Sequence, residues 1–222
     1  MSKLSVLAEI GAPDSSNGRT WGLRRTDLEQ LAAVHERLDG LKTVLVTGEE
    51  AVTPTLAVAL AGVGAAAGES TALVECDIER PRLAAELGLS PTPGLHEYLR
   101  WEASPPDVVQ PLALAGSAAG GQPGELVCVT AGRPAGSARA LLELGSFRHM
   151  TAKLREAYGL TILLGPPLEG AGGALGSAAA ESDCTLAALS QKPNRRAARA
   201  TYEALSWLQA RPFGAVVVTP TE

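Results

Sequence analysis

The sequence predicts an α/β domain with a mostly parallel central sheet and helices on both faces of that sheet. Two observations lead to this fold class. The candidate strands are continuously apolar and do not alternate with polar residues, which is typical of parallel strands buried on both faces. Segments with helical spacing separate these runs, as crossover connections between parallel strands require. A ligand site in such a sheet lies at the carboxyl ends of the strands.

The first 40 residues predict an N-terminal arm followed by a helix. Residues 1–22 are rich in Gly, Ser, Asn and Pro, which predicts an irregular arm. The helix that follows ends at Gly40 and has one apolar face, made of Leu28, Leu31, Val34 and Leu38. This face must be buried, either against the domain's own sheet or against another protein, so it is a candidate partner surface.

Residues 41–222 predict the α/β domain itself. Six apolar runs predict strands near 43–48, 71–74, 126–129, 160–164, 184–189 and 215–218. Helical spacing predicts helices near 55–67, 82–87, 95–100, 138–157 and 194–209. Between them, residues 103–124 are rich in Pro and Gly, which indicates a surface excursion.

The composition is that of a folded protein. Hydrophobic residues make up 45% of the chain and charged residues 19%, which excludes a disordered composition. A formal net charge of −5 gives no electrostatic reason to expect nucleic acid as a partner. The sequence shows neither a signal-peptide pattern nor an apolar run of membrane-spanning length. We therefore expect a cytoplasmic protein without a direct membrane span.

Neither the cysteines nor the histidines are spaced as metal ligands. Cys76, Cys128 and Cys184 lie far apart, and none belongs to a C-x-x-C pair. The three histidines are isolated along the chain. The sequence therefore predicts no metal site.

The first strand-to-helix turn has the frame of a phosphate-binding loop, G-x-x-x-x-G-K-[ST], but not its residues. It reads Gly48-Glu49-Glu50-Ala51-Val52-Thr53-Pro54-Thr55. In an intact loop, backbone N–H groups and the Lys bind phosphates, and the final hydroxyl binds Mg²⁺. Thr53 replaces the second Gly and Pro54 replaces the Lys, so of the ligand-binding side chains only Thr55 keeps its group, the metal-binding hydroxyl.

These replacements disfavour ATP. Pro54 removes both a cation and a backbone N–H group, and Thr53 resists the positive φ that a Gly would supply. Glu49 and Glu50 add negative charge beside the expected polyphosphate. The loop is therefore predicted to be degenerate.

Several further segments carry a family resemblance. The second predicted strand runs into Glu75-Cys76-Asp77-Ile78-Glu79-Arg80-Pro81-Arg82-Leu83, which matches a D-x-D-[LI]-R-[RK]-P-R-L signature in part. Ala131-Gly132-Arg133-Pro134 matches A-G-x-x-P after the third strand. Over residues 43–218 the chain thus resembles the bacterial tyrosine-kinase branch of the capsular exopolysaccharide family, which is related to MinD and ParA ATPases. The resemblance implies a P-loop NTPase-like fold of the MinD/ParA type.

The departures from this family fall at its chemistry. The family's D-T-P-P, whose Asp supports Mg²⁺, reads Leu164-Gly165-Pro166-Pro167 here, so Leu164 marks a lost metal-acid position. Glu75 and Asp77 are vestigial acids of the second strand. For Asp77 the simpler interpretation is a carboxylate that caps the following helix.

We therefore expect a non-catalytic pseudo-kinase or pseudo-ATPase, with no catalytic residue and neither ATP nor Mg²⁺ as cofactor. The resemblance implies an interaction or regulatory module in cell-surface polysaccharide assembly. Its partner would be a membrane-anchored chain-length regulator or an active paralogue that recruits it to the inner face of the membrane, and a homo-oligomer stays open. One alternative is a divergent but active ATP-dependent tyrosine kinase or ATPase, and another is a MinD/ParA-like positioning module.

Overall fold

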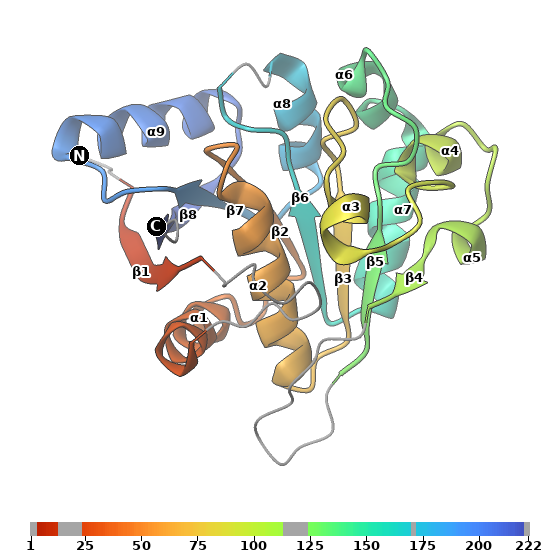
Figure 1. Cartoon of the computed structure of the whole chain (residues 1–222). Helices are drawn as coiled ribbons and strands as arrows, with labels where there is room; N and C mark the ends of the chain where they lie inside the picture. The colour runs from red at the N-terminus through yellow and green to blue at the C-terminus, as the bar shows by residue number, and fades with distance from the viewer. Residues whose placement is uncertain (1–3, 13–23, 113–123, 170–171, 220–222) are drawn as a thin grey trace.

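The computed structural model describes residues 4–12, 24–112, 124–169 and 172–219. Eight strands form one sheet in this part of the chain, in the order β1-β8-β7-β2-β6-β3-β5-β4 (Figure 1). Every neighbouring pair is parallel except β4 and β5. The strands are β1 (Val6–Gly11), β2 (Thr43–Gly48), β3 (Thr71–Glu75), β4 (Gln110–Pro111), β5 (Leu126–Val129), β6 (Leu160–Leu164), β7 (Cys184–Leu189) and β8 (Pro212–Thr219).

Helices cover both faces of the sheet. They are α1 (Arg25–Arg37), α2 (Thr53–Ala66), α3 (Leu83–Leu87), α4 (Leu95–Leu99), α5 (Pro105–Val108), α6 (Ala138–Leu142), α7 (Gly145–Ala157), α8 (Gly172–Ala180) and α9 (Arg195–Trp207). Side chains of α1 and α2 fill one core layer, and those of α4 and α6–α9 fill the other. Successive residues of β2 point into opposite core layers: Val44 and Val46 pack in the layer with α1 and α2, and Leu45 packs in the other layer. The predicted fold class is confirmed.

The six predicted strands correspond to β2, β3 and β5–β8. The predicted helix over 138–157 is two helices, because the chain turns between Leu142 and Gly145. Helix α8, with the sequence GGALGSAAA, was not predicted, because its glycines are typical of a loop. Its buried face consists of Ala174, Leu175, Ala178 and Ala179. Part of the predicted surface excursion, residues 113–123, lies outside the described residues.

The prediction of an irregular arm over residues 1–22 is wrong for Val6–Gly11, which form strand β1 beside β8. Ala8 and Ile10 of this strand are buried, whereas Glu9 is exposed. An edge strand with one buried and one solvated side gives only a short alternation of apolar and polar residues. In a segment rich in polar residues this alternation is difficult to recognise as a strand. The division of the chain at residue 40 stays a prediction.

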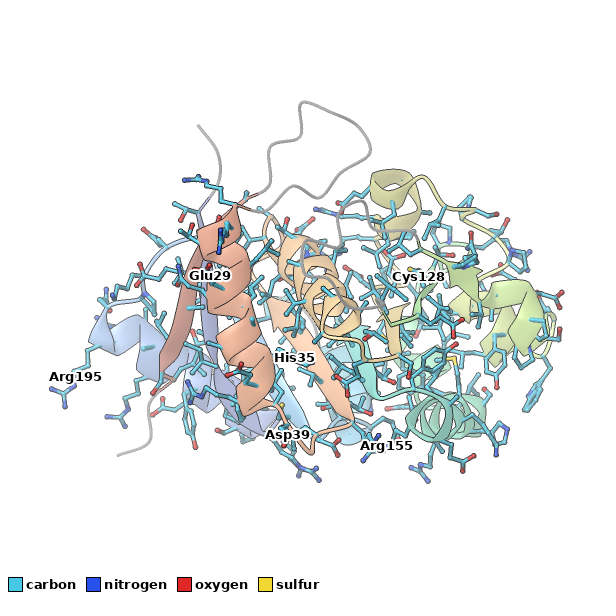
Figure 2. All side chains as sticks on the ribbon, turned by 90° about the horizontal axis from the view of Figure 1, so that it is seen from below. Glu29, His35, Asp39, Cys128, Arg155 and Arg195 are labelled. Atoms are coloured by element: carbon cyan, nitrogen blue, oxygen red, sulfur yellow. The ribbon has the colours of Figure 1, made fainter. Side chains whose placement is uncertain are left out.

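Helix α1 packs on its own domain. Leu31, Val34 and Leu38 are 0%, 1% and 2% exposed and share a core layer with β1 and α2. Figure 2 shows α1 and α2 side by side over the sheet, and the His35 ring on α1 lies 2.8 Å from a Glu69 carboxylate oxygen just after α2. The prediction that this apolar stripe is a partner surface is therefore wrong, because three of its four side chains are inaccessible. Only the fourth, Leu28, is partly exposed, at 38%.

Among the residues that the structure describes, no helix combines the length and the apolar character that a membrane crossing needs.

A pair of substitutions on α1 tests this packing. Leu31→Ala should lower the free energy of unfolding by about 2–5 kcal/mol, because it leaves a cavity in a closed core. Leu28→Ala, on the same helix but partly exposed, is the matched control and should cost less than about 1 kcal/mol. Denaturation in urea measures both values. A loss for Leu31→Ala as small as that expected for Leu28→Ala would show that the stripe is not part of the domain's core.

Candidate functional site

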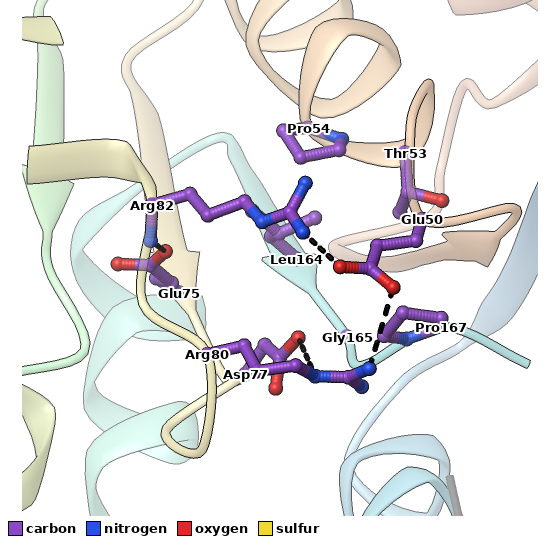
Figure 3. A pocket seen from close by; sticks show the side chains of 10 residues that line it. All are labelled: Glu50, Thr53, Pro54, Glu75, Asp77, Arg80, Arg82, Leu164, Gly165 and Pro167. Atoms are coloured by element: carbon purple, nitrogen blue, oxygen red, sulfur yellow. Dashed lines mark hydrogen bonds and ion pairs between the residues drawn. The ribbon is translucent and has the colours of Figure 1, made fainter. Parts of the chain in front are cut away.

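The candidate site lies where β2, β3 and β6 end at their carboxyl side. Ten residues from the ends of these strands, the loops that follow them and the start of α2 line a pocket there (Figure 3): Glu50, Thr53, Pro54, Glu75, Asp77, Arg80, Arg82, Leu164, Gly165 and Pro167. The enclosed part of this pocket measures about 10 Å³, which is about the least that holds one water molecule, and the rest of the pocket opens to solvent.

The loop after β2 begins at a position that only glycine can occupy. Gly48 has φ 145°, and a Cβ atom there would lie 2.1 Å from the carbonyl oxygen of Ala188 on β7. The Glu49 N–H group donates to the same Ala188 oxygen at 2.9 Å. The first Gly of the phosphate-loop frame is therefore explained by close packing of β2 on β7.

Two further N–H groups of this loop are engaged within the loop itself. The Glu49 carbonyl accepts from the N–H groups of Val52 and Thr53, at 3.2 and 3.1 Å, and from the Thr53 hydroxyl at 2.7 Å. Pro54 has no N–H group to offer. A phosphate cradle needs several loop N–H groups that face the ligand, and here the carbonyl of Glu49 takes two of them. Thr55 is half-buried and is not among the residues that line the pocket.

Two glutamates tie the loop to its neighbours. The Glu49 carboxylate accepts from the N–H group of Ser190, beyond β7, at 3.1 Å. The Glu50 carboxylate pairs with two arginines of the loop after β3: Arg80 Nη1 lies 3.5 Å from one oxygen, and Arg82 Nη2 bonds to the other (Figure 3). An acidic side chain thus stands in the loop that would carry the phosphate-binding Lys, and the cations come from the opposite loop.

The Glu75 carboxylate, at the end of β3, accepts hydrogen bonds from backbone N–H groups through both of its oxygens. One carboxylate oxygen accepts from the N–H groups of Arg82 and Leu83, at 2.5 and 2.9 Å, and the other from Ala131 at 3.0 Å. Burial of this carboxyl group, which is 1% exposed, raises its pKa, and these three N–H groups oppose that rise. Glu75 therefore caps the start of α3 and joins β3 to the end of β5.

Asp77 does not cap α3, so the simpler interpretation of this residue is wrong: Glu75 already takes the N–H groups at that helix start. One Asp77 oxygen lies 3.5 Å from Arg80 Nε. The other is buried and has no hydrogen-bond partner among the described residues. Burial raises the pKa of Asp77, with the Arg80 guanidinium acting in the opposite direction.

Leu164 ends β6 as part of the core. Its side chain is 3% exposed and belongs to the layer under α2, while its carbonyl accepts from the Cys76 N–H group at 2.8 Å. An aliphatic side chain thus forms the wall where the family resemblance expects a carboxylate. Among the described residues, no group of three His, Cys, Asp or Glu side chains gathers in a way that could hold a metal ion.

The sequence alone does not indicate the pairing of Glu50 with Arg80 and Arg82, because Glu50 lies 30 and 32 positions before them in the chain. The signal that could have found it is the charge pattern: two acids follow one strand and two arginines follow another, and both loops end at the same edge of a parallel sheet.

No family model matches the chain, and neither does any curated protein. Solved structures are similar at low sequence identity. The chimerical protein CapA2B2 is 18% identical with a TM-score of 0.81, over 98% of this chain and 96% of that one. The kinase domain of the Escherichia coli tyrosine kinase ETK is 17% identical with a TM-score of 0.79, over 98% and 91%.

This chain has the fold of bacterial tyrosine kinase domains. The septum site-determining protein MinD from Pyrococcus horikoshii, complexed with Mg-ADP, is more distant: it is 14% identical with a TM-score of 0.57, over 79% of this chain and 68% of that one. At these identities the likeness concerns the fold. It confirms the P-loop NTPase-like sheet of the MinD/ParA type that the resemblance implied.

The burial of Asp77 predicts how the stability of the folded chain depends on pH. Its pKa is raised in the folded chain above the ordinary 3.8, so the folded state binds this proton more tightly than the unfolded state does. The stabilisation is present at acid pH and is lost as the pH rises through the folded pKa. Asp77→Asn should therefore gain stability relative to the parent chain as the pH rises from about 4 through the raised pKa of Asp77.

Denaturant unfolding of both chains at several pH values in that window measures the difference. A variant whose relative stability falls as the pH rises would show that the Arg80 pair, and not burial, dominates at Asp77.

Proposed function

We propose that this chain is a non-catalytic pseudo-kinase or pseudo-ATPase that acts as an interaction or regulatory module in cell-surface polysaccharide assembly. One observation carries the proposal: the pocket at the carboxyl ends of β2, β3 and β6 is bridged by the pairs of Glu50 with Arg80 and Arg82, so its cations already hold a carboxylate of the same chain. A domain that has kept the fold and occupied this site from within keeps its surfaces for contacts with other proteins.

The chemistry supports the absence of catalysis. Phosphoryl transfer depends on positioning and on charges that stabilise the transferred group. Loss of a single preorganised donor lowers the rate by about 10²–10³. Here the Lys position is Pro54, the metal-acid position is Leu164, and the loop N–H groups of Val52 and Thr53 bind the Glu49 carbonyl. Such losses are not simply additive, but together they remove the cation, the metal support and the cradle.

The cellular setting follows from the family resemblance and from structural neighbours that are tyrosine kinase domains. In that setting the partner is a membrane-anchored chain-length regulator or an active kinase paralogue. The chain itself would be cytoplasmic and held at the inner face of the membrane by that partner.

A divergent but active ATP-dependent enzyme is the second candidate, since Arg80 and Arg82 bring two cations to the pocket. In that case the arginines would replace the missing Lys, and Glu50 would have to leave them when nucleotide binds. ATP binding separates the two candidates.

The first test is a thermal one. About 5 mM ATP with Mg²⁺ should change the melting temperature by less than about 1 °C, because a ligand stabilises only a native state that binds it. A ligand at 100 times its dissociation constant would add about 2.7 kcal/mol. For a domain of this size that gain corresponds to about 5–10 °C. A rise of several degrees, or steady release of phosphate, would favour the active enzyme.

The second test concerns the partner. The immobilised chain should retain the cytosolic segment of a chain-length regulator, or an active kinase paralogue, from its own organism, and should do so equally with and without MgATP. An α/β protein of similar size and charge serves as the control. Trp101 and Trp207, which are 73% and 87% exposed, provide alanine variants that map the contact. Retention that requires nucleotide, or no retention of either protein, would contradict the interaction module.

A further inference from the structure

Two guanidinium groups converge on one carboxylate at the rim of the pocket. Arg80 and Arg82 come from the loop after β3, and Glu50 comes from the loop after β2 (Figure 3). Each arginine contacts a different oxygen of the Glu50 carboxylate. A planar anionic group held between two guanidinium groups is the arrangement by which arginines bind carboxylates and phosphates.

We propose that Arg80 and Arg82 form an oxyanion site that Glu50 fills from within, and that a phosphate group competes with the Glu50 carboxylate for it. The ligand class is a phosphate-type oxyanion, either free or as a monoester. This site goes beyond the proposed function, since it needs neither the loop N–H groups nor a metal ion, and it does not require a nucleotide.

The internal occupant can be displaced because its pairs are open to water. The side chains of Glu50, Arg80 and Arg82 are 46%, 41% and 39% exposed. Exposed pairs of this kind contribute little to stability. A phosphate group offers the same two guanidinium groups more oxygens and more negative charge than one carboxylate does.

The surroundings both favour and limit the anion. Pro54, Leu164 and Pro167 give the pocket an apolar wall, which strengthens charge interactions there. The other two acids of the pocket are already engaged: Glu75 accepts three backbone N–H groups, and Asp77 lies beside Arg80. Asp77 lowers the affinity for an anion by its charge, so Glu50 and Asp77 are the side chains that oppose binding.

The chain contains a matched control for this site. Glu102 also pairs with two arginines, Arg100 at 2.7 Å and Arg133 at 2.5 Å, away from the pocket and with comparable exposure. In each cluster one arginine keeps a second acidic partner, Arg133 with Glu97 and Arg80 with Asp77, so Glu102→Gln removes the same kind of pairs as Glu50→Gln does. It therefore separates a built site from a general gain of positive charge.

The experiment measures inorganic phosphate binding by thermal shift at constant ionic strength, for the parent chain, Glu50→Gln, Glu102→Gln and the double variant Glu50→Gln/Arg82→Gln. Removal of two exposed pairs predicts that Glu50→Gln binds phosphate roughly 2- to 30-fold more tightly than the parent chain. Glu102→Gln should bind phosphate as the parent does, and the double variant should lose the gain.

A second series with glycerol 3-phosphate identifies the source of the group. A gain with both probes assigns the site to a phosphate group in general, and a gain with inorganic phosphate alone assigns it to the free ion. The proposal is overturned if Glu50→Gln gains no affinity for either probe, or if Glu102→Gln gains as much.

Discussion

The parallel pairing of β2 with β7 and β6, and of β6 with β3, places the loops of the candidate site. All four strands are buried along their whole length, so their register is fixed by both core layers at once. Their carboxyl ends therefore meet at one edge, where the loop after β2 lies between β7 and the loop after β3. Gly48 shows how tight this arrangement is, because its backbone lies against Ala188 too closely for any side chain. Whatever this domain does at that edge must be done by the short loops that the sheet holds there.

Several groups of those loops are engaged from within, which is the physical basis for a site that the chain itself occupies. The Glu49 carbonyl accepts the N–H groups of Val52 and Thr53, and the Glu50 carboxylate pairs with the guanidinium groups of Arg80 and Arg82. Glu75 binds backbone on two sides of β3. The fold is shared with tyrosine kinase domains at 17–18% identity, so the fold by itself decides nothing about activity. The side chains at this one edge do.

The sequence predicted the parts of the fold that have strong local patterns and missed those that depend on distant contacts. Continuous apolar runs located β2, β3 and β5–β8 because strands buried on both faces leave no other pattern. Strand β1 was missed because only one of its sides is buried, and α8 because its glycines look like a loop. In the site, the loop frame and Leu164 were located by resemblance. The helix cap was assigned to Asp77 although it belongs to Glu75, and the partner of Glu50 was missed, since both depend on which loops the sheet brings together. The apolar stripe of α1 could not be assigned from sequence, because burial against one's own sheet and against a partner give the same spacing.

The most direct test of a closed, non-catalytic site is a crystal structure of the chain grown with a saturating concentration of ADP and Mg²⁺. The account predicts that the Glu50 carboxylate still contacts Arg80 and Arg82, that Leu164 still forms the wall of the pocket, and that no nucleotide lies at the end of β2. Density for ADP between Thr53 and Arg82, with Glu50 turned away from both arginines, would contradict it.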